Sequence, residues 1–176
     1  MPVIKHPNQR VGIFIDVQNL YHSAKNLYKA KVNFKEVLKT AVADRQLVRA
    51  IGYVIATESG EEKGFFEALT KLGIETKEKD LQIFLGGLKK ADWDVAIAVD
   101  SLRLAPSLDT VVICSGDGDF NPLVEQLQSM GKQVEVIAFS RSASSKLQEV
   151  VDDFVDLCEK PEKYLLGKSK IIRRKK

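Results

Sequence analysis

The sequence has little cysteine and no long apolar run. Its two cysteines, Cys114 and Cys158, lie 44 positions apart without a CxxC pair, which argues against a zinc knuckle and a disulfide framework. The longest apolar runs are a few residues, far short of the ~20 that cross a bilayer. The first ten residues contain no apolar stretch of signal-peptide length. We therefore expect a cytoplasmic protein without a membrane partner.

The composition that remains is that of one globular domain with a charged end. Of 176 residues, 44% are hydrophobic and 29% are charged, with a net charge of +3. Residues 168–176 carry six positive charges and no acid, so residues 1–167 have a net charge of −3. We expect a domain over residues 1–160 and a basic tail over 161–176. Such a tail is a common handle for nucleic acid, and also a common solubilising end.

Hydrophobic periodicity predicts alternating strands and helices along the chain. A doubly wound α/β fold follows, with a mainly parallel sheet and helices on both faces. Two short extended pieces, at 74–76 and 81–85, are expected to form a hairpin. The predicted strands are 11–16, 47–56, 110–114 and 134–139, and the predicted helices are 19–31, 34–41, 60–72, 92–104, 121–130 and 144–151.

Polar residues follow two of these strands, where the ligands of a doubly wound sheet collect. Asp16 and Asn19 follow the first strand, and the turn SGDGD at 115–119 follows the strand at 110–114. Neither strand end supplies a lysine or arginine that would pair its acids, a pattern that favours a divalent cation. Gly116 and Gly118 allow the tight or left-handed backbone that would let two carboxylates converge.

The residue spacing of the turn does not fit several other binding motifs. A dinucleotide fingerprint needs glycine where Asn121 stands, and a calcium loop starting at Asp117 would need glycine and glutamate where Pro122 and Gln128 stand. Neither a P-loop nor a nucleophile elbow occurs. One plain alternative stays open: Asp117 and Asp119 cap the following helix. A phosphatase with an aspartate nucleophile is disfavoured, because Asp16 is followed by valine and glutamine rather than by Asp-x-Asp.

A third acidic segment is KKADWDVAIAVD at residues 89–100. Asp94 opens an otherwise apolar helix, where a buried carboxylate needs a partner. Asp100 lies six residues later, about 120° around the helix, so one ion cannot take both. We expect Asp94 to be a ligand, Asp100 a supporting or structural acid, and Asp92 the helix cap.

These motifs together resemble the NYN domain of the PIN-like nuclease superfamily, in its LabA-like branch. The resemblance rests on FIDVQNLY, KKADWDVAIAVDSL and VVICSGDGDFNPLVEQLQSMGKQVEVI, and spans residues 9–158. It implies a PIN-like fold and a metal-dependent nuclease acting on RNA. Asp16, Asp94, Asp117 and Asp119 match the acidic ligands of the family, and Asn19 matches the residue that orients the first of them.

Hard carboxylate ligands without histidine or cysteine suit Mg²⁺ or Mn²⁺. Four clustered carboxylates repel one another, so at least one is expected to have a pKa above the usual ~3.9. Ser115 and Asp100 are expected to support the ligands. An RNA-binding regulator of the same fold, without cleavage, is the alternative function, and self-association into a homo-oligomer is left open. The candidate RNA contacts are Lys89, Lys90, Arg141, Ser144, Arg173 and Arg174.

Overall fold

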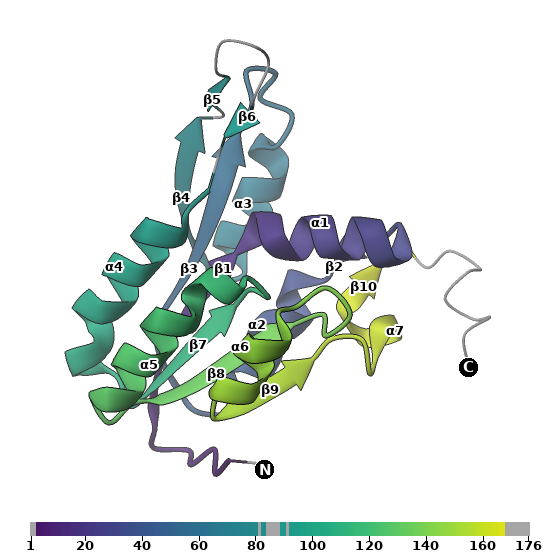
Figure 1. Ribbon diagram of the computed structural model, residues 1–176. Helices are drawn as coiled ribbons and strands as arrows, with labels where there is room; N and C mark the ends of the chain where they lie inside the picture. Colours follow the sequence, from purple (N-terminus) through teal and green to yellow (C-terminus); the bar gives the residue numbers. More distant parts are fainter. Residues whose placement is uncertain (1–2, 81, 84–88, 91, 168–176) are drawn as a thin grey trace.

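A six-stranded parallel sheet forms the centre of the molecule (Figure 1). The computed structural model describes residues 3–80, 82–83, 89–90 and 92–167. For residues 82–83 and 89–90 only the backbone is described. The strand order is β4-β3-β1-β7-β8-β9, and every neighbouring pair is parallel. The strands are β1 (Arg10–Asp16), β3 (Gln46–Ala56), β4 (Glu75–Asp80), β7 (Thr110–Cys114), β8 (Gln133–Ala138) and β9 (Asp153–Asp156). The doubly wound α/β fold is confirmed.

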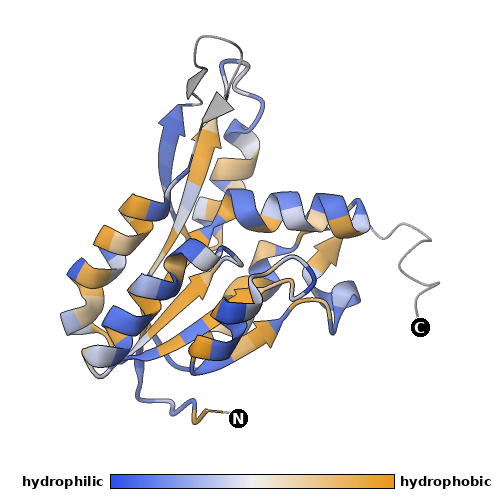
Figure 2. Ribbon diagram, viewed as in Figure 1, coloured by the Kyte–Doolittle hydropathy of each residue, from blue (hydrophilic) through white to orange (hydrophobic). Residues whose placement is uncertain are grey.

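Helices cover both faces of this sheet. On one face, α1, α2 and α3 pack on a core that includes Val11 and Ile13 of β1. On the other face, α4, α5 and α6 pack on a core that includes Phe14. Because β1 is buried on both sides, its sequence is a continuous apolar run, and Figure 2 shows the central strands in orange. The helices are α1 (Val17–Tyr28), α2 (Phe34–Val42), α3 (Lys63–Lys71), α4 (Asp94–Leu104), α5 (Asn121–Ser129), α6 (Ser145–Val150) and α7 (Pro161–Tyr164), with 3-10 turns η1 (Ala105–Ser107) and η2 (Gly118–Phe120).

The order of the strands reverses direction between β1 and β7. From β1 the chain moves outward through β3 and β4, and it then returns to the other side of β1 to build β7, β8 and β9. Crossovers that lead away on opposite faces leave a crevice at the carboxyl ends of the two central strands. The acidic motifs of the sequence follow these two strands.

Several elements differ from the prediction. The hairpin predicted for 74–76 with 81–85 is wrong, because β4 is an edge strand parallel to β3, and a separate antiparallel pair joins β5 (Gln82–Ile83) to β6 (Lys89–Lys90). Asp92 is not the cap of α4: the cap position is Trp93, without a side-chain hydrogen bond. The strand β9 was not predicted.

The fold continues past residue 160, where the sequence analysis ends the domain. Helix α7 leads into β10 (Leu165–Leu166), which pairs with β2 (Lys31–Val32) in antiparallel fashion. Tyr164 and Leu165 are buried, because α7 and β10 close the core beside α2. In the described part of the chain, no helix combines the length and the apolar character that crossing a membrane requires.

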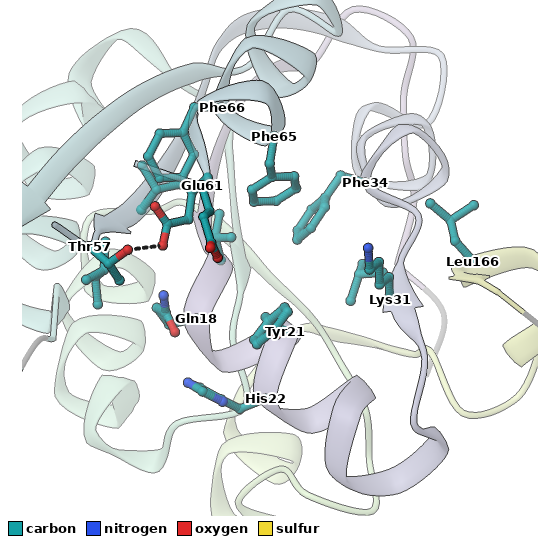
Figure 3. A pocket seen from close by; sticks show the side chains of 15 residues that line it. Gln18, Tyr21, His22, Lys31, Phe34, Thr57, Glu61, Phe65, Phe66 and Leu166 are labelled. Carbon is teal, nitrogen blue, oxygen red and sulfur yellow. Dashed lines mark hydrogen bonds between the residues drawn. The ribbon is translucent and has the colours of Figure 1, made fainter. Parts of the chain in front are cut away.

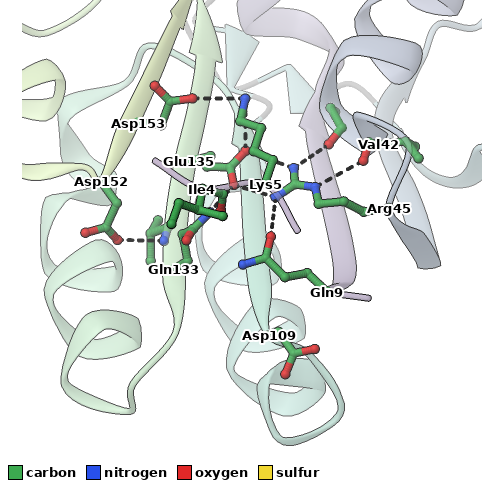
Figure 4. Close-up of polar contacts among 12 residues, drawn as sticks. Ile4, Lys5, Gln9, Val42, Arg45, Asp109, Gln133, Glu135, Asp152 and Asp153 are labelled. Atoms are coloured by element: carbon green, nitrogen blue, oxygen red, sulfur yellow. Dashed lines mark hydrogen bonds and ion pairs between the residues drawn. The ribbon is translucent and has the colours of Figure 1, made fainter. Parts of the chain in front are cut away.

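A buried ion pair joins the two halves of the sheet near its amino edge (Figure 4). Arg45, directly before β3, donates two hydrogen bonds to the carboxylate of Glu135 on β8, at 2.7 and 3.0 Å. Both side chains are almost completely buried. The remaining guanidinium donors bind the carbonyl oxygens of Val42 and Ala41 and the side chain of Gln9, so Arg45 has no unsatisfied N–H group.

Candidate metal centre

The loops that follow β1 and β7 are tied together by hydrogen bonds. The two strands are adjacent and parallel, so their carboxyl ends lie side by side. The Ser115 hydroxyl donates to Oδ2 of Asp16 at 3.2 Å, and the Gly116 N–H donates to Oδ1 of Asn19 at 3.0 Å. Asn19 and Ser115 therefore fix the acidic turn of β7 against the start of α1.

Three aspartates converge at this point. Asp94, Asp117 and Asp119 each offer one carboxylate oxygen, and these oxygens lie within 4.8 Å of one another. Asp94 comes from the start of α4, whereas the other two belong to the turn after β7. The Asp119 N–H donates to Oδ1 of Asp117 at 2.9 Å, which holds the turn in shape. A set of carboxylates without histidine or cysteine has the chemistry of a site for a hard divalent cation.

Asp16 lies beside these three carboxylates and is not one of the group. Its side chain caps α1 by accepting the Asn19 N–H at 3.2 Å, and only 8% of the residue is exposed. Burial raises the pKa of Asp16, with a smaller contribution from the charge of Asp117. Both carboxylate oxygens already accept a hydrogen bond, so Asp16 is held in one orientation at the rim of the cluster.

Asp94 is the carboxyl group most affected by the cluster. Burial, followed by the charges of Asp117 and Asp16, raises the pKa of Asp94 to about 7. The direction agrees with the expectation that one clustered carboxyl binds its proton more tightly than usual, although burial contributes more than the repulsion between the carboxylates. Among the residues with described side chains, no lysine, arginine or histidine forms an ion pair with any of the four aspartates. Within this described part of the chain, the negative charge of the cluster is therefore not neutralised by an ion pair.

The NYN domain family model matches residues 10–158, which includes every residue of this centre. The chain belongs to the NYN domain family. It is similar to the Low amplitude and bright protein LabA of Synechococcus elongatus, with 24% identity over 163 residues, covering 84% of this chain and 83% of that protein.

Two further proteins are similar to this chain. The uncharacterized protein MJ0482 of Methanocaldococcus jannaschii is 28% identical over 169 residues, which is 95% of this chain and 62% of that protein. The crystal structure of VPA0982, a protein of unknown function from Vibrio parahaemolyticus, superposes with a TM-score of 0.83 at 31% identity, covering 93% of this chain and 100% of that chain.

The glycines of the acidic turn in this NYN domain serve close packing. Neither Gly116 nor Gly118 has a positive φ, so the left-handed backbone that the sequence allowed is not used. A Cβ atom at Gly116 would lie 2.8 Å from Cβ of Ala143, and one at Gly118 would lie 2.8 Å from Oγ of Ser144. The turn therefore approaches the loop before α6 more closely than residues with side chains would permit.

Of the predicted RNA contacts, two have described side chains, and both belong to the loop before α6. Ser144 caps α6 by accepting the Leu147 N–H and, next to Gly118, is close to the acidic turn. Arg141 is exposed in the same loop. Outside the described side chains lie Lys89, Lys90, Arg173 and Arg174.

Asp100 does not contact the cluster. Its carboxylate accepts hydrogen bonds from the Tyr53 hydroxyl and from Nζ of Lys77, both at 2.7 Å. Burial alone would raise the pKa of Asp100, but these two partners outweigh it and lower the pKa. Asp100 thus anchors α4 to β3 and β4, as its position 120° around the helix from Asp94 implies.

An aromatic groove that the sequence did not reveal lies beside α1 (Figure 3). Its volume is about 790 Å³, and it begins at Val17 and Gln18, directly after Asp16. Tyr21 of α1 lies on one side, and Phe34 and Phe65 lie on the other. The sequence gives no signal for this groove, because its walls come from α1, β2, α2, β3, α3 and β10, which only the tertiary fold brings together.

Proposed function

We propose that this NYN domain is a metal-dependent nuclease that hydrolyses phosphodiester bonds in RNA. The observation that carries the proposal is the convergence of Asp94, Asp117 and Asp119, within 4.8 Å, at the carboxyl edge of the sheet. Membership of the NYN family supports the reaction class. The net charge of +6 in residues 168–176 supports a polyanionic substrate.

The three carboxylates would hold Mg²⁺ or Mn²⁺, with Asp16 next to them. Such a cation supplies charge to neutralise the phosphate, to activate a water molecule and to stabilise the leaving oxygen. The protein positions the ligands in advance. The side chain of Asn19 accepts a hydrogen bond from the Gly116 N–H, and the Ser115 hydroxyl donates one to Asp16, so the ligands do not have to rearrange. Asp94 must lose its proton for full ligation, and with a pKa of about 7 it is only partly deprotonated at neutral pH, so binding of the cation would displace the remaining proton.

The cleavage test uses the full chain and a labelled single-stranded RNA. With millimolar Mn²⁺ we expect shorter products to accumulate on a denaturing gel, and with EDTA we expect the RNA to stay intact. RNA that binds in both conditions and is never cut would favour the regulator that holds RNA without cleaving it. Hydrolysis of nitrophenyl phosphate in place of RNA would instead point to a small-ester phosphatase.

Metal binding is also expected to raise the melting temperature of the protein. A ligand at one hundred times its Kd stabilises the folded state by about 2.7 kcal/mol, which for a chain of this size is roughly 5–10 °C. The gain should be larger at pH 8 than at pH 6, because Asp94 is mostly deprotonated at the higher pH. Differential scanning fluorimetry with Mn²⁺ and with EDTA measures it, and an unchanged melting temperature at millimolar Mn²⁺ contradicts the site.

A further inference from the structure

The segment that follows Asp16 carries positive charge only. Residues 17–35 contain four lysines and no aspartate or glutamate. On α1 and just after it, the side chains of Tyr21, His22, Lys25 and Lys29 are exposed. Tyr21, Lys25 and Lys29 are four residues apart, which places them on one side of the helix, and His22 lies next to Tyr21. An aromatic and basic strip therefore runs along α1, which begins directly after Asp16, to the end of this helix.

Two cavities lie along this strip and share part of their walls. The aromatic groove begins at Val17, the residue that follows Asp16, and a second cavity of about 500 Å³ is lined by Lys25, Lys29 and Lys31 together with Gly167. Tyr21, Lys31 and Leu166 belong to both. The two cavities thus form a hollow surface that extends from Val17 to Gly167, and the six cations of residues 168–176 follow Gly167 in the sequence.

The two sides of the strip carry opposite charges. Lys25, Lys29 and Lys31 lie on the side of α1 and β2, whereas Glu61 and Glu62 line the opposite wall of the aromatic groove. A phosphate backbone would be attracted to the lysines and repelled by the glutamates. Bases would then point inward to the groove, whose floor is apolar.

Tyr21 has the properties of a stacking platform at the junction of the two cavities. Its residue is 40% exposed, its ring lies 5.9 Å from Nζ of Lys25, and its centroid lies 5.3 Å from that of His22. Phe65, also exposed, lies across the groove with its ring 5.7 Å from that of Phe34. Exposed aromatic rings next to lysines are the usual elements of single-strand recognition.

We propose that single-stranded RNA lies along α1, with its phosphates on Lys25, Lys29 and Lys31 and a base stacked on Tyr21. From Gln18 to Lys29 the path follows the helix for about 16 Å, long enough for several nucleotides. This inference rests on the proposed function, because it supplies the route by which RNA reaches Asp94, Asp117 and Asp119. Tyr21 is the last residue of the motif FIDVQNLY, whereas Lys25, Lys29 and Lys31 lie outside all the sequence motifs.

The test measures RNA binding by fluorescence anisotropy in EDTA, so that nothing is cut. Each lost phosphate contact lowers the slope of log K against log salt by about 0.7 for a single strand. Lys25→Gln/Lys29→Gln is therefore expected to lower it by about 1.4. The matched pair Lys39→Gln/Lys71→Gln removes the same charge from exposed positions of α2 and α3 and should leave the slope unchanged.

The stacking contact is tested separately. Tyr21→Ala should weaken binding about tenfold without a change in slope, whereas Tyr21→Phe, which keeps the ring, should bind like the wild type. Equal slopes for the two lysine pairs contradict the proposed path of RNA along α1. Full affinity in Tyr21→Ala also contradicts it. So does a result in which Tyr21→Ala changes only the sedimentation of the protein, because the surface then serves a second copy.

Failure of the strip and failure of the nuclease proposal give different results. A wild-type chain that cuts RNA with Mn²⁺, while both lysine pairs show one slope, overturns the strip and leaves the nuclease standing. A chain with the expected slopes that cuts no RNA with Mn²⁺ supports the strip and contradicts the nuclease. All variants are compared with the wild type by circular dichroism, so that loss of folding is not read as loss of binding.

Discussion

Asp94→Asn is expected to abolish metal-dependent cleavage of RNA and, at the same time, to stabilise the metal-free protein at pH 8. The first effect follows because the variant loses one of the three converging carboxylates. Charge stabilisation by a bound cation is worth several kcal/mol in such reactions, so the rate should fall by about 1000-fold or more. A gel assay with Mn²⁺ measures this loss.

The second effect follows from the pKa of Asp94. Burial and the charges of Asp117 and Asp16 raise this pKa to about 7 in the folded protein, whereas an unfolded chain has a value near 3.9. The folded state therefore binds the proton more tightly, and the wild type loses stability as pH rises from about 4 to about 7. Asparagine has no such proton to lose. Because Asp94 is half-exposed, solvent reduces the effect, and we expect a gain in melting temperature of roughly 2–4 °C at pH 8 in EDTA.

Glu125→Gln is the matched control for this experiment. Glu125 is an exposed carboxylate on α5, so its loss should change neither cleavage nor the pH dependence of the melting temperature. The difference in melting temperature between Asp94→Asn and the wild type should increase from pH 5 to pH 8. A gap that is constant with pH, or a variant that is less stable than the wild type at pH 8 without metal, contradicts the account of the cluster.

The fold was largely predictable because its strands are buried on both faces. A strand such as β1 must be apolar along its whole length, and such a run is visible without any knowledge of its neighbours. β9 was missed for the opposite reason. Its residues, Asp153–Asp156, are only partly buried and two of the four are acidic, so the segment does not look like a strand until β8 is beside it.

The acidic centre was predictable from topology combined with residue type. Residues directly after parallel strands must meet at one edge, so Asp16 could be paired with the turn 115–119 before the structure was known. Which acids converge was less accessible, because Asp16 uses its oxygens to cap α1 and to bind Ser115. The roles of Gly116 and Gly118 depended on Ala143 and Ser144, which belong to another loop.

The second large effect concerns stability alone. Arg45→Met is expected to lower the free energy of unfolding by roughly 3–5 kcal/mol, because it leaves the buried carboxylate of Glu135 without its main partner. Glu135 is 1% exposed. Its remaining contacts are Nζ of Lys5 at 3.6 Å and the side-chain amide of Gln133 at 2.9 Å, and they cannot replace two charge-assisted bonds. Urea denaturation measures the loss.

The double variant Arg45→Met/Glu135→Leu separates the charge from the packing. If the penalty comes from an unpaired charge, removing Glu135 as well should recover most of the stability, since apolar residues of similar volume often replace a buried ion pair without cost. If the double variant is as unstable as Arg45→Met, the loss of stability comes from lost packing around Arg45 and not from the unpaired charge of Glu135.

Cleavage by the folded fraction of Arg45→Met should equal that of the wild type. Arg45 directly precedes β3 and Glu135 lies near the start of β8, so the ion pair is at the amino edge of the sheet, opposite the acidic centre. Charge repulsion among Asp94, Asp117 and Asp119 thus lowers stability at the carboxyl edge of the sheet, whereas the buried charges at the other edge are fully paired. Opposite responses of stability and cleavage in Arg45→Met and Asp94→Asn would follow from this division, and a loss of cleavage in fully folded Arg45→Met would contradict it.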